Sequence, residues 1–435
     1  NLSEEPIAAG LDEARQRLGG IADGFLMHDR EIITRCDDSV VRPAGPDLIL
    51  VRRARGYAPL PLQLPLGSPA PLLAVGPHLK NTATLVHGRV AFMTPHVGDL
   101  ESVETLDHFQ HLIASCRRLF HIDPEVVAHD LHPGYLSTRV AEELRLRKIG
   151  VQHHHAHIAA VASEHGVTGT IVGLAFDGTG YGPDGTVWGA EVLLADLRDY
   201  QRVAHLRYAP LPGGDLAARA PWRAALGYLS LEPERIEAFR NAFGGIPPVE
   251  LELARTQVIR MINAPLASSM GRLFDAAAAV IGARFVAQYE GQAAMELEAL
   301  AGRQPAGRLL PFPVRETGGG WELDPLPLLG ALGEMRNRGT AQSQLAADFH
   351  ASVAAAAVRV ARWAAALGGV DTVALGGGTF QNARLTTLIR EGLTRAGLTV
   401  LFPRRLGPND GAISYGQAAV AAARLIQGLM TDSRA

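Results

Sequence analysis

A pattern of alternating strands and helices occurs twice along this chain of 435 residues and constrains its fold more than any other feature. In each copy, short apolar runs typical of strands are followed by a helical segment, another strand and another helix. The first copy begins near Leu72, and the second begins at Thr170 and runs to the C-terminal helix. Strands that alternate with helices in this way indicate an α/β protein.

The doubled pattern is typical of the two-lobed actin-like, ribonuclease-H-like fold, in which ligands bind at the carboxyl ends of the strands. We expect residues 1–66 to form a separate α/β segment that ends in a proline-rich linker, YAPLPLQLPLGSP. Residues 67–435 then form the main domain. Its first lobe spans about 67–168 and its second about 169–435, with a mostly helical insertion at about 210–340.

Some local predictions are more specific. The runs LLAVG, TATLVHG and VAFMTP predict a three-strand meander, and EIITR at residues 31–35 predicts another strand. TIVGLAF predicts a buried strand that ends on Asp177. The segment from Leu100 to Phe120 predicts an amphipathic helix, and the alanine-rich stretch at residues 341–367 predicts another helix.

Composition narrows the class of protein. The chain is 47% hydrophobic and 20% charged with a net charge of -3, so nothing favours nucleic acid or an anionic membrane surface as a partner. No apolar run reaches the roughly 18 residues of a membrane span. Two separated cysteines fit a reducing, cytoplasmic environment. The first residues contain neither an initiator methionine nor a signal pattern, so we expect a piece of a longer chain.

Histidines crowd the segment VQHHHAH, and this cluster is the strongest chemical signal. His153 and His157 are four residues apart, so on a helix both imidazoles lie on one face and can provide half of a metal site. Surface or core histidines are the alternative, but four histidines within five residues disfavour it. We do not expect His154 and His155 to be ligands, because they point elsewhere on the helix.

Two aspartates in glycine turns can complete such a site. Asp177 lies in FDGTGYG and is either a metal ligand or a turn residue that bonds its own backbone. Asp410 lies in PNDGAISYG, where capping of the last helix is an equally good explanation. Two imidazoles and two carboxylates suit iron or zinc, with or without magnesium as a further ion.

Glycine turns after buried strands let a backbone approach a phosphate. Two such turns follow TIVGLAF and TVAL, and Asn382 begins the helix after the second turn. Polar side chains near predicted strand ends of the first lobe are candidate substrate contacts. They are Lys80, Asn81, His96, Asp130 and His132.

Taken together, the motifs resemble those of the hydrogenase-maturation carbamoyltransferase family HypF, over essentially the whole chain and in order. They include VQHHHAHIAAV, FDGTGYG, SSMGRLFDAAAAVIG, QYEGQAAMELE, LGGGTFQN and PNDGAISYGQA. Residues 1–66 resemble the closing part of the family's YrdC-like domain, and the rest resembles its TsaD-like carbamoyltransferase domain. LGGGTFQN has a glycine where a serine is usual.

The resemblance implies a function and a set of site residues. It implies that the carbamoyl group of carbamoyl-adenylate, made with ATP, passes to the C-terminal cysteine of the partner protein HypE and becomes a cyanide ligand of nickel–iron hydrogenase. The implied metal ligands are His153, His157, Asp177 and Asp410. The implied ATP or AMP contacts are Gly178, Thr179, Gly180, Gly271, Asp275, Gly377, Gly378 and Asn382.

Other functions remain open on this reading. An actin-like kinase or ATPase would use the same fold and glycine turns, but a magnesium-dependent kinase has no need of paired histidines. Another O- or N-carbamoyltransferase with a TsaD-like domain would share the motifs. A third alternative is a metal-dependent scaffold that docks the partner protein without catalysis.

Overall fold

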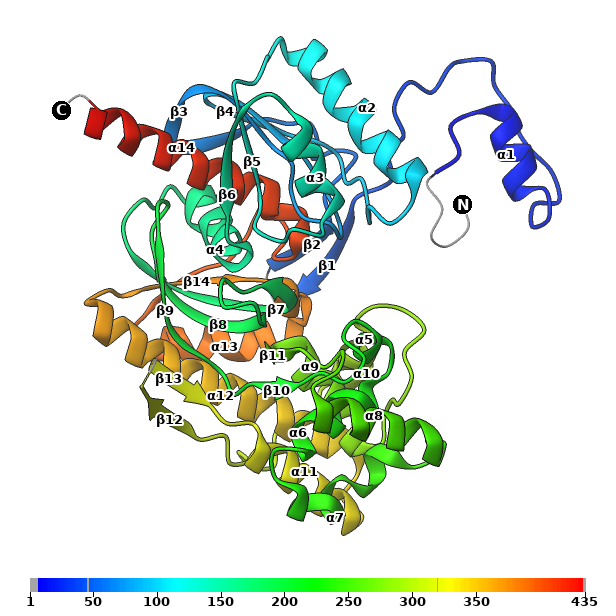
Figure 1. Ribbon diagram of the computed structural model, residues 1–435, viewed down its shortest axis with the longest axis vertical. Coiled ribbons are helices and arrows are strands. Elements are labelled where there is room, and N and C mark those ends of the chain that lie inside the picture. The colour runs from blue at the N-terminus through cyan, green and yellow to red at the C-terminus, as the bar shows by residue number, and fades with distance from the viewer. Residues whose placement is uncertain (1–6, 45–46, 319, 433–435) are drawn as a thin grey trace. The chain divides into compact units, whose positions relative to one another are not determined.

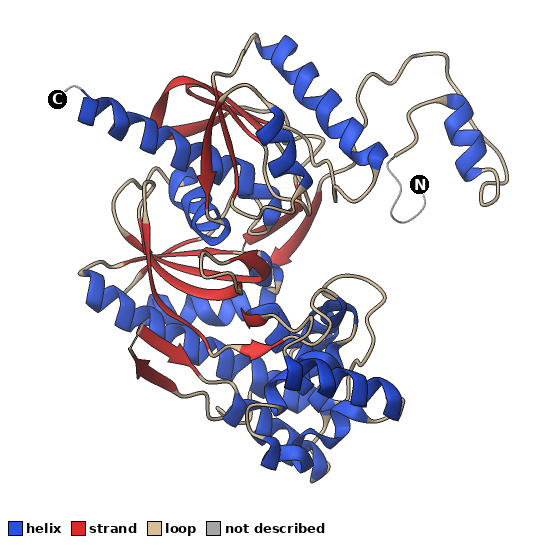
Figure 2. Cartoon of the chain, viewed as in Figure 1, coloured by secondary structure: helices blue, strands red, loops and turns tan. Residues whose placement is uncertain are grey.

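A computed structural model describes residues 7–44, 47–318 and 320–432 (Figure 1, Figure 2). Two compact units make up this part of the chain. The first holds residues 7–42, 50–168 and 404–432, and the second holds 43–44, 47–49, 169–318 and 320–403. Each unit has its own sheet and its own helices, so each is described separately.

The first unit is built around a four-stranded sheet in the order β4-β3-β5-β6. Strands β3 and β4 are antiparallel, whereas β5 and β6 run parallel to β3. The sheet strands are β3 (Leu62–Ala74), β4 (Thr84–Met93), β5 (Val126–Asp130) and β6 (Arg147–Val151). The helices are α1 (Leu11–Leu18), α2 (Val103–Phe120), α3 (Leu136–Glu143), α4 (His153–Glu164), η4 (Asp410–Ala412) and α14 (Ile413–Asp432). Strands β1 (Val40–Ala44) and β2 (Asp47–Arg52) form a separate two-stranded sheet.

Both faces of the first sheet are covered by helices. Alternate residues of a strand point to opposite faces, and Leu73, Leu85 and Val127 share one core cluster with Phe109 and Leu112 of α2. The other face is covered by α14, which packs against β3 and against α4 (Figure 1). This second layer matters for function because α4 carries the histidine cluster and α14 follows Asp410.

The second unit contains a larger mixed sheet with the path β12-β13-β9-β8-β7-β14-β15. Strands β7, β8 and β9 form an antiparallel meander, and β14 and β15 run parallel to β7. The path strands are β7 (Ile171–Tyr181), β8 (Val187–Ala195), β9 (Tyr200–Leu206), β12 (Val314–Thr317), β13 (Gly320–Leu323), β14 (Thr372–Gly376) and β15 (Thr399–Leu401). Two short strands, β10 (Ala209–Pro210) and β11 (Leu266–Ser269), pair beside β8.

Helices surround this second sheet. The long α12 (Gln342–Gly368) packs against β7, β8 and α13 (Ala383–Arg395), and α9 (Met270–Ile281) packs against β7. The remaining helices are α5 (Leu216–Arg219), α6 (Pro221–Leu229), η1 (Pro233–Arg235), α7 (Ile236–Phe239), η2 (Arg240–Phe243), α8 (Pro248–Arg260), α10 (Gln292–Ala301), α11 (Leu326–Asn337) and η3 (Gly378–Gln381). The described residues between 210 and 340 are mostly helical.

The structure confirms the doubled α/β architecture. Each unit has antiparallel strands continued by two parallel strands, which is the plan expected for the actin-like fold. No helix in the described ranges combines the length and apolar character needed to cross a bilayer.

Several local predictions were wrong. The predicted linker YAPLPLQLPLGSP is largely strand β3, and TATLVHG and VAFMTP form the single strand β4, so the meander has two strands instead of three. The strand tolerates these prolines because its pairing with β4 is irregular, with register shifts on both sides of Ser68. Its pairing with β5 is limited to Leu72–Ala74. EIITR is not a strand; Ile33 is 83% exposed, and no described strand pairs with this segment.

Strand β7 does not end on Asp177 but continues to Tyr181. Its pairing with β8 shifts register between Phe176 and Gly180. A bulge of this kind changes the direction of a side chain without ending the strand. The sequence indicated a turn at the glycines, and the glycines produce a bulge instead.

Candidate functional site

The predicted histidine pair lies at the start of α4 in the first unit. The helix begins directly after β6, and its N-cap Gln152 accepts a hydrogen bond from the backbone N–H of His155 at 2.9 Å. His153 and His157 are buried, and their ring centroids are 5.0 Å apart at an interplanar angle of 80°. The spacing of four residues therefore places both imidazoles on one face, as predicted.

Asp410 lies beside this pair in the same unit. Its Oδ1 is 3.6 Å from Nε2 of His153 and 3.5 Å from Nε2 of His157. The sequence left open whether Asp410 caps the last helix. In the structure the neighbouring Asn409 caps η4, the short helix that leads into α14, because its Oδ1 accepts from the N–H of Gly411 at 3.1 Å. The carboxylate of Asp410 is thus directed to the two imidazoles.

The geometry of these three side chains suits a metal ion. Ligand atoms of His153, His157 and Asp410 all lie within 4.8 Å of one another. Separations of 3.5–3.6 Å are long for hydrogen bonds. Ligand atoms about 2.0–2.1 Å from a tetrahedral ion would be separated by roughly 3.3 Å. Two imidazoles and a carboxylate, mostly buried, are donors typical of zinc or iron.

In the second unit, Asp177 connects the two glycine turns. Its Oδ1 accepts hydrogen bonds from the N–H groups of Gly178 at 2.8 Å and Gly378 at 3.0 Å. Gly377 has φ 106°, and a Cβ there would lie 2.2 Å from the carbonyl oxygen of Phe176. Only glycine allows the turn after β14 to approach β7 this closely.

The start of α9 packs against the first of these turns. Ser269 caps the helix by accepting from Arg272 N at 3.1 Å, and it donates to the carbonyl of Gly178 at 2.5 Å. A Cβ on Gly271 would meet the Cα of Gly178 at 2.9 Å. The hydroxyl of Ser268 donates to the buried Glu191 at 2.6 Å, which ties the same helix start to β8.

The sequence predicted that Asp275, on the same helix, contacts the nucleotide. It lies buried with its Oδ2 2.8 Å from Nε of Arg272. Burial raises the pKa of Asp275 to about 6, and the neighbouring Arg272 limits that rise. Thr179 and Gly180 lie within β7, where Gly180 pairs with Trp188. The structure thus brings Asp177, Gly178, Gly271, Gly377 and Gly378 together in one unit, and their nucleotide contacts stay predictions.

Asn382 has structural partners that the sequence did not reveal. Its Oδ1 caps α13 by accepting from Leu385 N at 2.9 Å, and its Nδ2 lies 2.9 Å from Nε2 of His350 on α12. Nδ1 of His350 is 2.7 Å from the carbonyl of Ala346. Burial lowers the pKa of His350 to about 4, so the ring is neutral and orients the Asn382 amide. A contact of Asn382 with a nucleotide remains a prediction.

The candidate substrate contacts of the first unit differ in burial and in the groups that they contact. Asn81 is buried and donates to the carbonyls of Val75 and Pro77. The pKa of His96 is lowered to about 4 by burial. Lys80 has a φ of 47°, and its backbone N–H donates a hydrogen bond of 2.7 Å to Oδ1 of Asp99. The ring of His132 stacks on Tyr135 with centroids 4.1 Å apart. A role for these residues in substrate binding stays a prediction.

Two residues of α14 belong to this neighbourhood but were not singled out. Ser414 lies 2.7 Å from Thr82 and 2.8 Å from Thr84 through their hydroxyls, and Gln417 accepts from Gly76 N at 2.9 Å. Ser414 and Gln417 are three residues apart in the mostly apolar first half of α14, and this spacing was the available signal.

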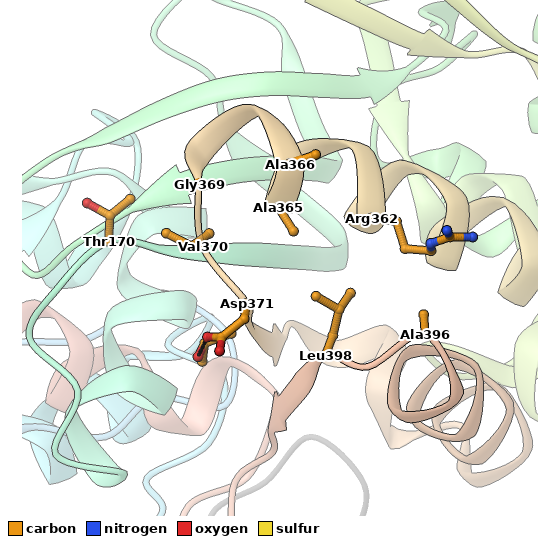
Figure 3. A pocket seen from close by; sticks show the side chains of 10 residues that line it. Thr170, Arg362, Ala365, Ala366, Gly369, Val370, Asp371, Ala396 and Leu398 are labelled. Carbon is orange, nitrogen blue, oxygen red and sulfur yellow. Dashed lines mark hydrogen bonds between the residues drawn. The ribbon is translucent and has the colours of Figure 1, made fainter.

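A surface hollow lies elsewhere in the second unit. It has a volume of about 700 Å³ and is lined by residues such as Thr170, Arg362, Asp371 and Leu398 (Figure 3). Thr170, Asp371 and Leu398 immediately precede β7, β14 and β15, so the hollow lies at the amino ends of these strands, beside α12. The glycine turns follow the carboxyl ends, and no predicted site residue lines the hollow.

Comparison with known families defines the class of this protein. The family described as "Carbamoyltransferase, Kae1-like Domain, second subdomain" matches residues 173–417, and the "HypF Kae1-like domain" matches residues 67–164. Fold and sequence thus define a protein with a Kae1-like carbamoyltransferase domain.

Individual relatives identify the family. Carbamoyltransferase HypF2 of Cupriavidus necator is 46% identical over 98% of this chain and 56% of its own length. A HypF homolog from the same organism is 40% identical over 82% of this chain and 93% of its own length. The chain therefore belongs to the HypF family of carbamoyltransferases, and it spans about half the length of most curated relatives it matches.

Solved structures of HypF proteins are similar to this chain over almost its whole length. Full-length HypF in a phosphate- and nucleotide-bound form has a TM-score of 0.93 and 41% identity, covering 98% of this chain and 56% of that one. HypF of T. kodakarensis has a TM-score of 0.89 and 32% identity, covering 98% of this chain and 57% of that one.

Proposed function

We propose that this chain performs the carbamoyl-transfer step of hydrogenase maturation, passing the carbamoyl group of carbamoyl-adenylate to the C-terminal cysteine of HypE. Membership of the HypF family supports the transferase class. The observation that carries the proposal further is the arrangement of His153, His157 and Asp410 around one point. A kinase that relies on magnesium would not need two imidazoles there.

Asp177 is the proposed fourth ligand beside His153, His157 and Asp410. Its Oδ1 is fixed by two backbone N–H groups, so the carboxylate has a defined orientation in its own unit. A divalent zinc or iron ion bound by this set would act as a Lewis acid that neutralises phosphate charge and polarises a carbonyl.

The glycine turns are the proposed phosphate cradle. Gly178 and Gly378 have no side chain, so a phosphate can approach the backbone closely. A nucleotide-bound HypF relative supports ATP or AMP as the ligand. The proposed contacts include Gly178, Thr179, Gly180, Gly271, Asp275, Gly377, Gly378 and Asn382.

The proposed transfer step is a displacement at the carbamoyl carbon. The acceptor cysteine loses its proton, and the thiolate forms a C–S bond to that carbon. The bond from the same carbon to the phosphate oxygen breaks, and AMP leaves with the bonding electron pair. A bound divalent ion would neutralise the charge on the leaving phosphate.

A single-turnover assay tests the proposal. The chain is mixed with synthetic carbamoyl-adenylate and a peptide that ends in cysteine, and thiocarbamate is measured by mass spectrometry. We expect product that disappears after treatment with a chelator and returns with zinc or iron. A matched peptide ending in serine should give far less product. Hydrolysis of ATP or phosphorylation of the peptide, without thiocarbamate, would instead support a kinase or ATPase.

A further inference from the structure

A buried carboxylate lies directly behind the first histidine of the pair. Asp130 ends β5 and His153 begins α4 just after β6, the neighbouring parallel strand (Figure 1). Oδ2 of Asp130 is 2.8 Å from Nδ1 of His153, and both side chains are fully buried. Both residues lie in the first unit, so this contact depends on one sheet and the helix that follows it.

The rest of the Asp130 residue is also fixed by the fold. Its Oδ1 accepts from the backbone N–H of His132 at 3.0 Å, and its carbonyl accepts from the hydroxyl of Thr138 at 3.2 Å. One oxygen of the carboxylate therefore accepts a hydrogen bond from the following loop, and the other contacts the imidazole of His153. A buried side chain committed in this way is poorly placed to contact a substrate.

The contact determines which nitrogen of His153 can meet an ion. A neutral imidazole carries one N–H, and the nitrogen that bears it cannot ligate a metal. A carboxylate beside Nδ1 favours the proton there, which leaves the lone pair of Nε2 directed toward Asp410, 3.6 Å away. Carboxylates behind metal-bound histidines act generally in this way, and their loss typically weakens metal binding 10–100-fold.

We propose that Asp130 is a positioning residue that holds His153 as the Nδ1–H tautomer and presents Nε2 to the ion. The proposal rests on the metal site given under Proposed function. It assigns Asp130 to the support of the site, in place of the substrate contact predicted from the sequence.

Metal affinity provides the first test. Asp130→Asn keeps the shape of the side chain but removes its charge, and the zinc dissociation constant of the full chain is measured by competition with a chromophoric chelator. We expect affinity to fall 10–100-fold. Thr138→Val is the matched control, since it removes a hydrogen bond at the same strand end without changing the carboxylate. An effect of Asp130→Asn no larger than that of Thr138→Val would overturn the proposal.

The tautomer of His153 provides a readout that needs no metal. Nitrogen-15 NMR of the metal-free, histidine-labelled chain distinguishes protonated from unprotonated ring nitrogens, and His153→Gln assigns the signal. We expect a protonated Nδ1 in the wild type and its loss in Asp130→Asn. A wild type with the proton mainly on Nε2 would overturn the positioning role. A wild type that binds no metal would overturn the proposed ligand set, while this spectrum would still decide how Asp130 acts on His153.

A double variant separates positioning from general damage. If Asp130 acts through His153, Asp130→Asn should weaken zinc binding little further once His153 is already glutamine. Additive losses from the two substitutions would show that Asp130 acts by another route and would count against the proposal.

Discussion

Oδ1 of Asp177 accepts a hydrogen bond of 3.0 Å from the backbone N–H of Gly378, a residue 201 positions later in the chain. The same oxygen accepts from Gly178 at 2.8 Å. One carboxylate oxygen therefore joins the bulge in β7 to the turn that follows β14. These two segments carry most of the glycines for which a phosphate-binding role was predicted, so their spacing depends on this side chain.

Substitution of Gly378 by alanine should disturb both turns. A Cβ at this position would lie 2.9 Å from Oδ1 of Asp177, so the carboxylate or the turn must shift. We expect AMP affinity, measured by isothermal titration calorimetry, to fall at least about tenfold, or about 1.4 kcal/mol. The far-ultraviolet circular dichroism spectrum should not change.

The matched control for this prediction is Gly169→Ala. A Cβ on Gly169 would meet no atom within 4 Å, and this glycine lies in the same unit just before β7. Its AMP affinity should equal that of the wild type. Equal affinity in Gly378→Ala as well would show that the turn has only a structural role.

Loss of one imidazole should abolish stoichiometric metal binding. His157→Ala removes one of the three donors that surround a single point in the first unit. We expect the zinc or iron content, measured by plasma mass spectrometry after dialysis, to fall from near one per chain to a small fraction. His165→Ala, at the C-cap of the same helix, should retain the metal. Unchanged stoichiometry in His157→Ala would contradict the assignment of this residue as a ligand.

The sequence predicted the helices more accurately than the bounds and pairing of the strands. The amphipathic pattern predicted α2, because its apolar face packs within the core, and the alanine-rich composition predicted α12. The first part of β3, QLPLGSPA, was missed because prolines usually mark linkers, and only pairing with β4 shows how β3 accommodates them. EIITR has the composition of a strand, but a strand also requires a partner, which local sequence does not supply.

The candidate site was predictable where spacing alone determines geometry. The interval between His153 and His157 is such a case, because a helix of any origin places them on one face. The sequence could not decide whether Asp410 is a metal ligand or a helix cap, since both Asn and Asp are common N-cap residues. The structure assigns the cap to Asn409. The contact of Asp130 with His153 joins residues 23 positions apart and depends on the pairing of β5 with β6.

The close approach of α14 to α4 should make Gly416 intolerant of substitution. A Cβ on Gly416 would lie 1.9 Å from the carbonyl oxygen of Ala156, which stands between the two histidines of the pair. We expect Gly416→Ala to lower the free energy of unfolding by about 1–3 kcal/mol through overpacking. Metal affinity should fall too, because α4 carries the imidazoles and Asp410 immediately precedes α14.

Gly428→Ala is the control for that substitution. It places the same methyl group in the same helix, where the nearest atom would be a guanidinium nitrogen of Arg147 at 4.0 Å. Alanine is the better helix former, so this variant should be as stable as the wild type or more stable by about 0.5–1 kcal/mol. Thermal melting of both variants checks the prediction, which would be wrong if Gly416→Ala melted together with Gly428→Ala.

The buried His350 should make the second unit sensitive to mild acid. Burial lowers the pKa of His350 from 6.5 to about 4, so the folded protein keeps the ring neutral where the unfolded chain takes up a proton. The stability from this neutral ring is fully present above pH 6.5 and is lost as the pH falls from 6.5 toward 4. The maximum loss corresponds to about 3 kcal/mol.

His350→Gln tests this effect, because glutamine does not titrate and can still bond the amide of Asn382 on α13. We expect the variant to melt at a lower temperature than the wild type at pH 7.5, since the packing of the ring is lost. Between pH 6.5 and 4.5, however, its melting temperature should fall less steeply than that of the wild type. Parallel slopes over this range would show that His350 does not contribute to the acid sensitivity and that its pKa in the folded protein is near the ordinary value.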